Sequence, residues 1–413
     1  MRPAARKIPG AGSSKPVEAA PDRTALELSI LAGLLFLPNG LHLPYFPVWL
    51  SARGLSDAEI AAALATPLVL RVVATPLIAA FADRRGIGVA LSLAATALLL
   101  GYCGLRFAQG FAPIFAGALI VALAMGAMPA LADALTLTEI RRAELAGRPH
   151  IAYGHIRVWT SIGVLSMMLA SGRIVAAFPG ARIIVALALL SLFSVGVALF
   201  AAVRMNLRHA YPLGGARGGL TADAARLRLA IVGICAAALI QASHAEVYAF
   251  ATIHWRAEGF SPDRISAAWA IGVASESVLF LVAARYFRSE RNAIAFLVLG
   301  AAGAFVRWIA MSFDPGADTV IALQTLHGLS FGATTCGSVL LLGGLASPTH
   351  RARMQGWLAA AGALSLAAAT FASGRLTSLF GERVYLAMAA LALAGALAAL
   401  LAGWLKQRLP AAA

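Results

Sequence analysis

Twelve runs of roughly 20 apolar residues, each long enough to cross a hydrocarbon core of about 30 Å as a helix, recur along this chain. Alternating strand patterns are absent, which argues against a membrane barrel. With 60% hydrophobic and only 12% charged residues, the composition is also too apolar for a soluble domain. We therefore expect an all-α integral membrane protein. The runs lie near residues 25–49, 58–81, 88–107, 112–137, 152–176, 182–203, 228–252, 264–286, 292–313, 318–344, 355–378 and 384–405.

The connections between these runs are short except at residues 138–151 and 204–227. The second connection is rich in Gly and Arg and separates six runs from six. We therefore expect two six-helix halves, residues 24–203 and 228–413, joined by a cytoplasmic linker. Residues 1–23 have no apolar period and predict a disordered cytoplasmic tail. The first apolar run is too long for the core of a cleavable signal peptide.

A short internal repeat supports the division into halves. When Gly54-Leu55-Ser56 is placed on Gly259-Phe260-Ser261, 205 residues later, Arg71 falls on Glu276. The two intramembrane charges thus occupy equivalent places with opposite sign. Six-helix repeats of the same orientation are related by a pseudo-two-fold axis along the membrane normal, an arrangement found in secondary transporters.

The net charge of +15 resides mainly in the loops and tails. If both termini are cytoplasmic, that side carries 22 basic residues and the outer side carries 8. This bias follows the positive-inside rule, so we expect a multi-pass protein of the inner (plasma) membrane with both termini in the cytoplasm. The same bias accounts for the positive net charge, so no nucleic-acid partner is expected. The expected partners are the lipid bilayer, a small-molecule substrate and protons, and we expect a monomer.

No cofactor or metal is expected. The three cysteines, Cys103, Cys235 and Cys336, fall within apolar runs and show neither disulfide nor metal-ligand spacing. We expect them to behave as inert, small hydrophobic side chains.

Ionisable residues inside the apolar runs are the strongest functional signal, because a charge at the centre of a membrane helix costs about 2.5–3.5 kcal/mol. Glu276 and His327 lie near mid-membrane, counted at about 1.5 Å per residue. Glu246 and Arg307 share a depth in the outer half. A carboxyl group kept from water holds its proton near neutral pH, and an imidazole titrates in the same range. We expect these four residues to couple the protein to protons.

The depth of a residue in the membrane does not determine which acid pairs with which base. Each charged residue could also hold helices together without any role in transport. The candidate pairs are Glu246 with Arg307 or His244, Glu276 with Arg157 or His327, and Asp133 with Arg157.

Arg71, also near mid-membrane, is the candidate for binding an anion, because guanidinium can form two hydrogen bonds with a carboxylate. The first run contains Asn39-Gly40 and three prolines, so we expect it to be kinked and to line a cavity. For His42 we expect a structural or cavity-lining role rather than a proton relay. The other candidate substrate-binding residues are Tyr45, His244, Tyr248 and Trp269.

Four further charges are assigned to gating or to structural pairing. Asp83 and Arg84 stand in the loop FADRRGIG between the second and third runs. There Asp83 could accept hydrogen bonds from a helix N-terminus or from an arginine across an inner gate. Asp133 and Arg157 lie in the inner third of the fourth and fifth runs.

Several stretches resemble a known family. Asp83-Arg84-Arg85-Gly86 partly matches the loop signature of the major facilitator superfamily, with Ala79 in place of the usual leading Gly and Ile87-Gly88 in place of the trailing basic pair. The chain also resembles the phenylpropionate permease group, relatives of the lactose/proton symporters. That likeness rests on PYFPVWLSARGLS in the first run, YGHIRVWTSIG at Tyr153–Gly163, SHAEVYAFATIHWRAEGFS at Ser243–Ser261, VASES around Glu276, Arg307-Trp308, and LQTLHGLSFGA at Leu323–Ala333.

The resemblance implies the major facilitator fold and proton-coupled uptake by alternating access. Arg307 and His327 are the nearest counterparts of an Arg and a His that take part in proton coupling in lactose permeases. Those permeases also carry a Glu three residues after the His, where this chain has Ser330. The resemblance therefore leaves proton carriage to Glu276. The group name implies an aromatic carboxylate as substrate, although members with sugar or nucleoside substrates look alike at this level.

The favoured function is a secondary active transporter, namely a proton-coupled symporter of a small organic solute. A proton-coupled exporter of hydrophobic compounds and a sugar or nucleoside symporter remain as alternatives on the same fold. A membrane enzyme or receptor is disfavoured by the six-plus-six repeat, and an enzyme also by the lack of a nucleophile–base or metal-ligand spacing.

Overall fold

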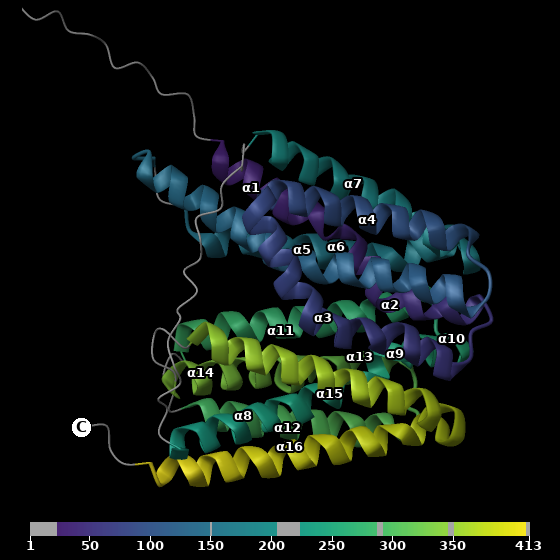
Figure 1. Cartoon of the computed structure of the whole chain (residues 1–413). Helices are drawn as coiled ribbons and strands as arrows, with labels where there is room; N and C mark the ends of the chain where they lie inside the picture. Colours follow the sequence, from purple (N-terminus) through teal and green to yellow (C-terminus); the bar gives the residue numbers. More distant parts are fainter. Residues whose placement is uncertain (1–22, 149–150, 205–223, 287–291, 346–350, 410–413) are drawn as a thin grey trace, which may run out of the picture.

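The computed structural model describes all residues except 1–22, 149–150, 205–223, 287–291, 346–350 and 410–413. Figure 1 shows two stacked groups of long helices, α1 to α7 above and α8 to α16 below. Helices suit these apolar runs because the bilayer core offers no water to the backbone, so each N–H and C=O must find its partner within the segment.

The first group contains the helices of the N-terminal half. They are α1 (Thr24–Leu35), α2 (Leu37–Ala52), α3 (Asp57–Arg85), α4 (Ile87–Phe107), α5 (Phe111–Leu145), α6 (Tyr153–Ala177), the 3₁₀ turn η1 (Gly180–Arg182) and α7 (Ile183–Arg204).

The second group contains the helices of the C-terminal half. They are α8 (Ala224–Ala242), α9 (Ala245–Ala249), α10 (Ala251–Ala257), α11 (Pro262–Tyr286), α12 (Ala293–Met311), α13 (Ala317–Gln324), the π-helical turn η3 (Gly328–Ala333), α14 (Thr334–Leu345), α15 (Arg351–Phe380), the 3₁₀ turn η4 (Gly381–Arg383) and α16 (Val384–Gln407).

Eleven segments of the described chain are long and apolar enough to span a membrane. The last of them, Arg353–Gln407, is 55 residues long and contains both α15 and α16, which fold back on each other at the η4 turn. Counting these two helices separately yields twelve crossings, which confirms the predicted all-α membrane fold. The predicted tail (1–23) and most of the predicted linker (204–227) lie outside the described residues, so the division at those positions stays a prediction.

The repeated Gly-x-Ser sequence builds the same turn in both groups. Gly54 and Gly259 have φ angles of 80° and 81°, in the left-handed region that glycine adopts without strain. Two residues later, Ser56 and Ser261 each accept a hydrogen bond from the backbone N–H three residues further on. The repeat therefore marks equivalent starts of α3 and α11.

Three crossings are interrupted inside the membrane. The first breaks at Phe36, two residues before Pro38, whose ring leaves no N–H for a helical hydrogen bond. The seventh breaks at His244 and again at Phe250, and the tenth contains the π-helical turn η3. Irregular backbone at membrane depth is tolerated where it is buried in protein or lines a cavity. These three crossings accordingly contribute residues to the site described below.

We call the side of the molecule on which α1 begins and α16 ends the terminal face, and the other side the opposite face (Figure 1). The two groups touch tightly near the opposite face. The Tyr45 hydroxyl donates to the Pro262 carbonyl at 2.8 Å. Gly172 and Gly374 let the backbones meet, because an added Cβ would lie 2.7 Å from the carbonyl oxygens of Pro262 and Asp57, respectively.

Toward the terminal face the same helices lose these contacts. From residue 69 to residue 85 of α3 only Ala82 is buried, and between residues 273 and 282 of α11 no residue is buried. The two groups therefore form a cleft that is closed at the opposite face and open at the terminal face.

Candidate functional site

A cavity of about 530 Å³ lies between the two groups of helices. Its volume is within the range of small-molecule pockets, roughly 300–1,000 Å³. Most of the lining is apolar, and a few polar groups converge on it from both groups. The polar and ionisable side chains of the lining are Asn39, His42, Arg71, Tyr248, Trp269, Glu276, Arg307, Gln324, His327 and Thr370.

Arg71 is the basic residue that the N-terminal group contributes to the cavity lining. It lies on α3 and runs across Gly126 of α5, where an added Cβ would overlap the guanidinium group. Among the described residues no ion pair or hydrogen bond joins Arg71 to another side chain. Its fork of donors is therefore available to a ligand with an acidic group.

His42 and Phe46 form the neighbouring wall on α2. The His42 ring stacks on Phe46 with ring centroids 4.4 Å apart, and its Nδ1 lies 2.8 Å from the Tyr102 hydroxyl. Tyr102 is fully buried on α4. This contact fixes the imidazole in the lining of the cavity, where a cavity-lining role was predicted for it.

Glu276, His327 and Arg307 form a connected row in the C-terminal group. His327 Nε2 lies 3.7 Å from Glu276 Oε2, and His327 Nδ1 lies 3.1 Å from Arg307 Nη1. Arginine can only donate, so Nδ1 of the neutral imidazole accepts and Nε2 keeps its proton on the side of Glu276. The row therefore presents a hydrogen-bond donor to the carboxyl group that lines the cavity.

Arg307 is almost fully buried, and its partners explain how the membrane tolerates it. The guanidinium donates to the Gln324 amide oxygen, and to the Ser330 hydroxyl at 3.4 Å. It also lies over the Trp308 ring, 4.5 Å from the centroid. Buried charges persist only when hydrogen bonds replace their water. These contacts supply hydrogen bonds for both Nη atoms, whereas Nε has no partner among the described residues.

Close helix packing brings Glu276 and His327 together. Gly328 of η3 lies against Ser275 of α11, where an added Cβ would be 2.6 Å from the Ser275 carbonyl oxygen. The Gly328 N–H also donates to the Ser275 hydroxyl at 2.9 Å. Because Ser275 and Gly328 directly neighbour Glu276 and His327 in sequence, this contact determines their separation.

The structure decides between the ion pairs that depth left open. Glu276 meets His327 and not Arg157. Arg157 instead lines a small cavity within the N-terminal group together with Asp133 and Tyr153. No ion pair joins Arg157 to Asp133 among the described residues, so the third candidate pair stays a prediction. The pairing predicted for Glu246 is wrong. Its carboxyl group accepts hydrogen bonds from the Thr377 hydroxyl at 2.9 and 3.1 Å and contacts neither Arg307 nor His244.

Two residues predicted to bind substrate do not line the cavity. Tyr45 is buried in the contact at the opposite face, where it bonds to Pro262 and to Ser266. His244 is fully buried behind the cavity wall, with Nε2 3.0 Å from the Ser330 hydroxyl. Tyr248 and Trp269, by contrast, do line the cavity.

Within the described residues, no ion pair or hydrogen bond joins Asp83 or Arg84 to the C-terminal group. Asp83 lines a second cavity of about 330 Å³ between α3, α4 and α5, together with Arg141. Arg84 is exposed at the end of α3. In this conformation the cleft is open at the terminal face, so an inner gate would not be assembled here.

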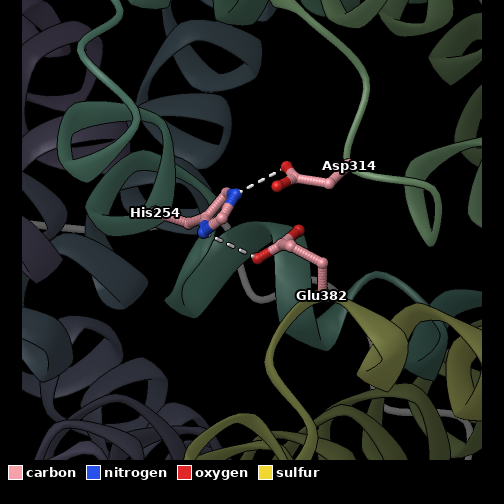
Figure 2. A group of neighbouring side chains, drawn as sticks. All are labelled: His254, Asp314 and Glu382. Atoms are coloured by element: carbon pink, nitrogen blue, oxygen red, sulfur yellow. Dashed lines mark hydrogen bonds and ion pairs between the residues drawn. The ribbon is translucent and has the colours of Figure 1, made fainter.

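Gln324 also lines the cavity and was not predicted as a site residue, although a polar residue inside an apolar run is a recognisable signal. A cluster of three side chains at the opposite face, shown in Figure 2, was not predicted from the sequence either. His254 Nε2 lies 2.8 Å from Asp314, and Nδ1 lies 3.1 Å from Glu382. These residues come from the end of α10, the loop after α12 and the η4 turn. Because they are far apart in the sequence, no spacing between them indicates that they meet. Burial in this turn raises the pKa of Glu382 to about 7.

Comparison with known proteins places this geometry in a family. The model described as MFS_1 like family matches residues 26–388. A protein of Escherichia coli (strain K12) described as a probable 3-phenylpropionic acid transporter is 29% identical over 381 residues, which cover 87% of this chain and 92% of the relative.

Solved structures with much lower identity share the fold. The nucleoside transporter NupG superposes with a TM-score of 0.73 at 16% identity, covering 94% of this chain and 100% of NupG. A bacterial homolog of the human lysosomal transporter Spinster, in an inward-facing and occupied conformation, has a TM-score of 0.70 at 14% identity over 95% of this chain and 100% of its own. At these identities the likeness shows the fold alone.

Proposed function

From the premise that this chain belongs to the MFS_1 like family, and so is a multi-pass membrane transporter and not an enzyme, we propose that it is a proton-coupled symporter of a small aromatic carboxylate. In this proposal the terminal face is cytoplasmic, and substrate enters the cell by alternating access. The excess of basic residues on the loops of the terminal face supports that orientation.

One observation carries the proposal. A single cavity holds Arg71, without an acidic partner among the described residues, on one group of helices and the Glu276–His327 pair on the other. An arginine in a largely apolar cavity suits a carboxylate with an apolar body. A carboxyl group beside an imidazole suits the binding and release of one proton.

The aromatic walls support the substrate class. Phe46, Tyr248, Trp269 and Phe331 line the same cavity as Arg71, and flat rings of this kind pack favourably against a phenyl group. The relative from Escherichia coli is described as a transporter of 3-phenylpropionic acid, which carries one phenyl ring and one carboxyl group. Both parts of that molecule have a counterpart in the cavity.

The coupling of substrate transport to proton transport depends on which groups in the cavity can gain or lose a proton. When the site faces the outside, the substrate carboxylate binds Arg71 and Glu276 takes a proton. The negative charge of the substrate and the positive charge of the proton therefore enter together, and the net charge of the cavity is unchanged. When the cleft opens at the terminal face, water reaches Glu276, which releases its proton. The His327 Nε2–H then stabilises the carboxylate left behind, and Arg307 holds the ring in the required orientation.

Transport by the purified protein in proteoliposomes tests this function. Wild-type protein is expected to accumulate labelled 3-phenylpropionate when the interior is made alkaline. Glu276→Gln is expected to bind and exchange substrate but to lose accumulation, whereas Glu258→Gln, a change at an exposed acid on the opposite face, should behave as wild type.

Three outcomes would contradict parts of the proposal. Accumulation by Glu276→Gln would remove the coupling role of this residue. Wild-type exchange without any response to the pH gradient would remove proton coupling. Net efflux driven by the gradient, or a preference for nucleosides or sugars in the same assay, would favour the alternatives on this fold.

A further inference from the structure

Glu246 is the buried acid that the proposed cycle at Glu276 leaves unused. It lies on the five-residue helix α9 with 1% of its surface exposed. Helices α2, α3, α10, α15 and α16 pack against α9. Two of them, α2 and α3, belong to the other half of the molecule, so Glu246 lies beside the contact that closes the cleft at the opposite face.

The titratable groups that act on Glu246 are acidic or neutral. They are Asp57 at the start of α3, Glu382 in the η4 turn and Tyr385 on α16. On the remaining neighbours, Arg375 of α15 and Arg256 of α10 are exposed, His254 of α10 is held by Asp314 and Glu382, and Tyr45 of α2 is bonded to Pro262 and Ser266. His42, also on α2, bonds Tyr102. Among the described residues, no ion pair joins Glu246 to a base.

The closed contact at the opposite face is therefore more stable when the Glu246 carboxyl group is protonated and neutral. An ionised carboxylate buried without a counter-charge is costly, and the nearby Asp57 and Glu382 add repulsion. A neutral acid needs an acceptor for its proton. The Ser373 hydroxyl lies within reach of the Glu246 carboxyl group, and the buried Tyr385 hydroxyl nearby has no hydrogen-bond partner in the described structure.

Opening the contact would reverse this preference. Gly374 of α15 packs on the backbone of Asp57, one helical turn from Thr377, which donates to Glu246. Separating α15 from α3 would admit water to the carboxyl group and stabilise its ionised form. Protonation and closure are thus linked at one residue.

We propose that Glu246 is a proton-operated latch, which must hold a proton for the two halves to close at the opposite face. This inference rests on the proposed alternating access, but it concerns the conformational step and not the carrier at Glu276. It predicts that acid closes this face and that alkali opens it, in the absence of substrate.

Distance measurements across the contact test the latch. After replacement of the three native cysteines, spin labels at Ala58→Cys and Ser378→Cys, two exposed positions on α3 and α15, would report the separation in lipid nanodiscs from pH 5 to pH 9. The short-distance population of the otherwise wild-type protein is expected to fall at least fivefold as the pH rises. With Glu246→Gln added it should stay high throughout, whereas Glu258→Gln should leave the wild-type response unchanged.

A second variant keeps the proposal falsifiable if Glu246→Gln fails to fold. Thr377→Val removes a donor that favours the ionised carboxylate, so the opening midpoint should move to higher pH. The latch is refuted if Glu246→Gln opens with the wild-type pH profile, if wild type does not respond to pH, or if Thr377→Val leaves the midpoint in place. None of these results depends on substrate or on a gradient, so failure of the latch and failure of symport are distinguishable.

Discussion

Replacing Arg71 is the most direct test of the proposed substrate class. The guanidinium lies in a largely apolar cavity, and it has neither an ion pair nor a side-chain hydrogen bond within the described residues. A hydrogen bond to a charged group contributes about 1.5–3 kcal/mol net. Because Arg71 is only partly buried, we take about 2–3 kcal/mol for the whole carboxylate contact. Arg71→Gln should therefore weaken binding of 3-phenylpropionate roughly 30- to 150-fold.

Calorimetry on purified protein with matched ligands measures this loss. The neutral alcohol 3-phenylpropanol has the same ring and chain, so its affinity should change less than about threefold in Arg71→Gln. Arg157→Gln serves as the control, because Arg157 lies by a separate small cavity. An equal loss for the acid and the alcohol would assign Arg71 a structural role. Unchanged acid binding would refute the anion site.

The position of Arg71 can also be tested without removing its charge. An added Cβ at Gly126 would overlap the guanidinium, so Gly126→Ala should displace the fork. The displaced guanidinium loses part or all of the contact of about 2–3 kcal/mol with the carboxylate, so we expect acid binding to weaken by up to roughly 150-fold. Gly104→Ala is the matched control, because an added Cβ there meets nothing within 4 Å. Equal effects of the two variants would contradict the proposed crossing.

Two further predictions concern packing and pH. Gly328→Ala would place its Cβ 2.6 Å from the Ser275 carbonyl oxygen, so we expect a loss of about 1–3 kcal/mol, seen as earlier melting in detergent. Gly343→Ala on the same crossing meets nothing within 4 Å, and melting as early as Gly328→Ala would contradict this reasoning. Burial raises the pKa of Glu382 from 4.5 to about 7, so the folded state binds the proton more tightly than the unfolded state. Wild-type stability should therefore fall as the pH rises from about 4.5 to about 7, and Glu382→Gln should flatten this fall in melting temperatures. Parallel curves for the two proteins would assign the pH dependence to other groups.

Much of the candidate site could be anticipated from depth along each apolar run. Glu276, His327, Arg71 and Arg307 all reach the central cavity, as their positions near mid-membrane or in the outer half of the crossings suggested. Depth did not show which way a side chain faces. Glu246 was expected beside Arg307 or His244, and it lies instead against Thr377.

The sequence does not show how each helix is rotated about its own axis. A helix that is apolar on all sides has no polar face to indicate its orientation, so burial against protein and exposure to lipid look alike in the sequence. The breaks at Phe36, Phe250 and the η3 turn then change the helical phase within a crossing. His244 lies at the break before α9 and does not line the cavity.

By itself, the sequence determined the twelve crossings and the equivalent turns at Gly54 and Gly259. Long apolar runs must satisfy their own backbone, and those turns need left-handed residues. The tertiary structure alone decided which charges meet, because helix packing brings residues such as Glu276 and His327 together across 51 positions of sequence. It also decided that the cleft closes at the opposite face, where glycines let backbones touch, since close approach depends on both partners and not on either segment alone.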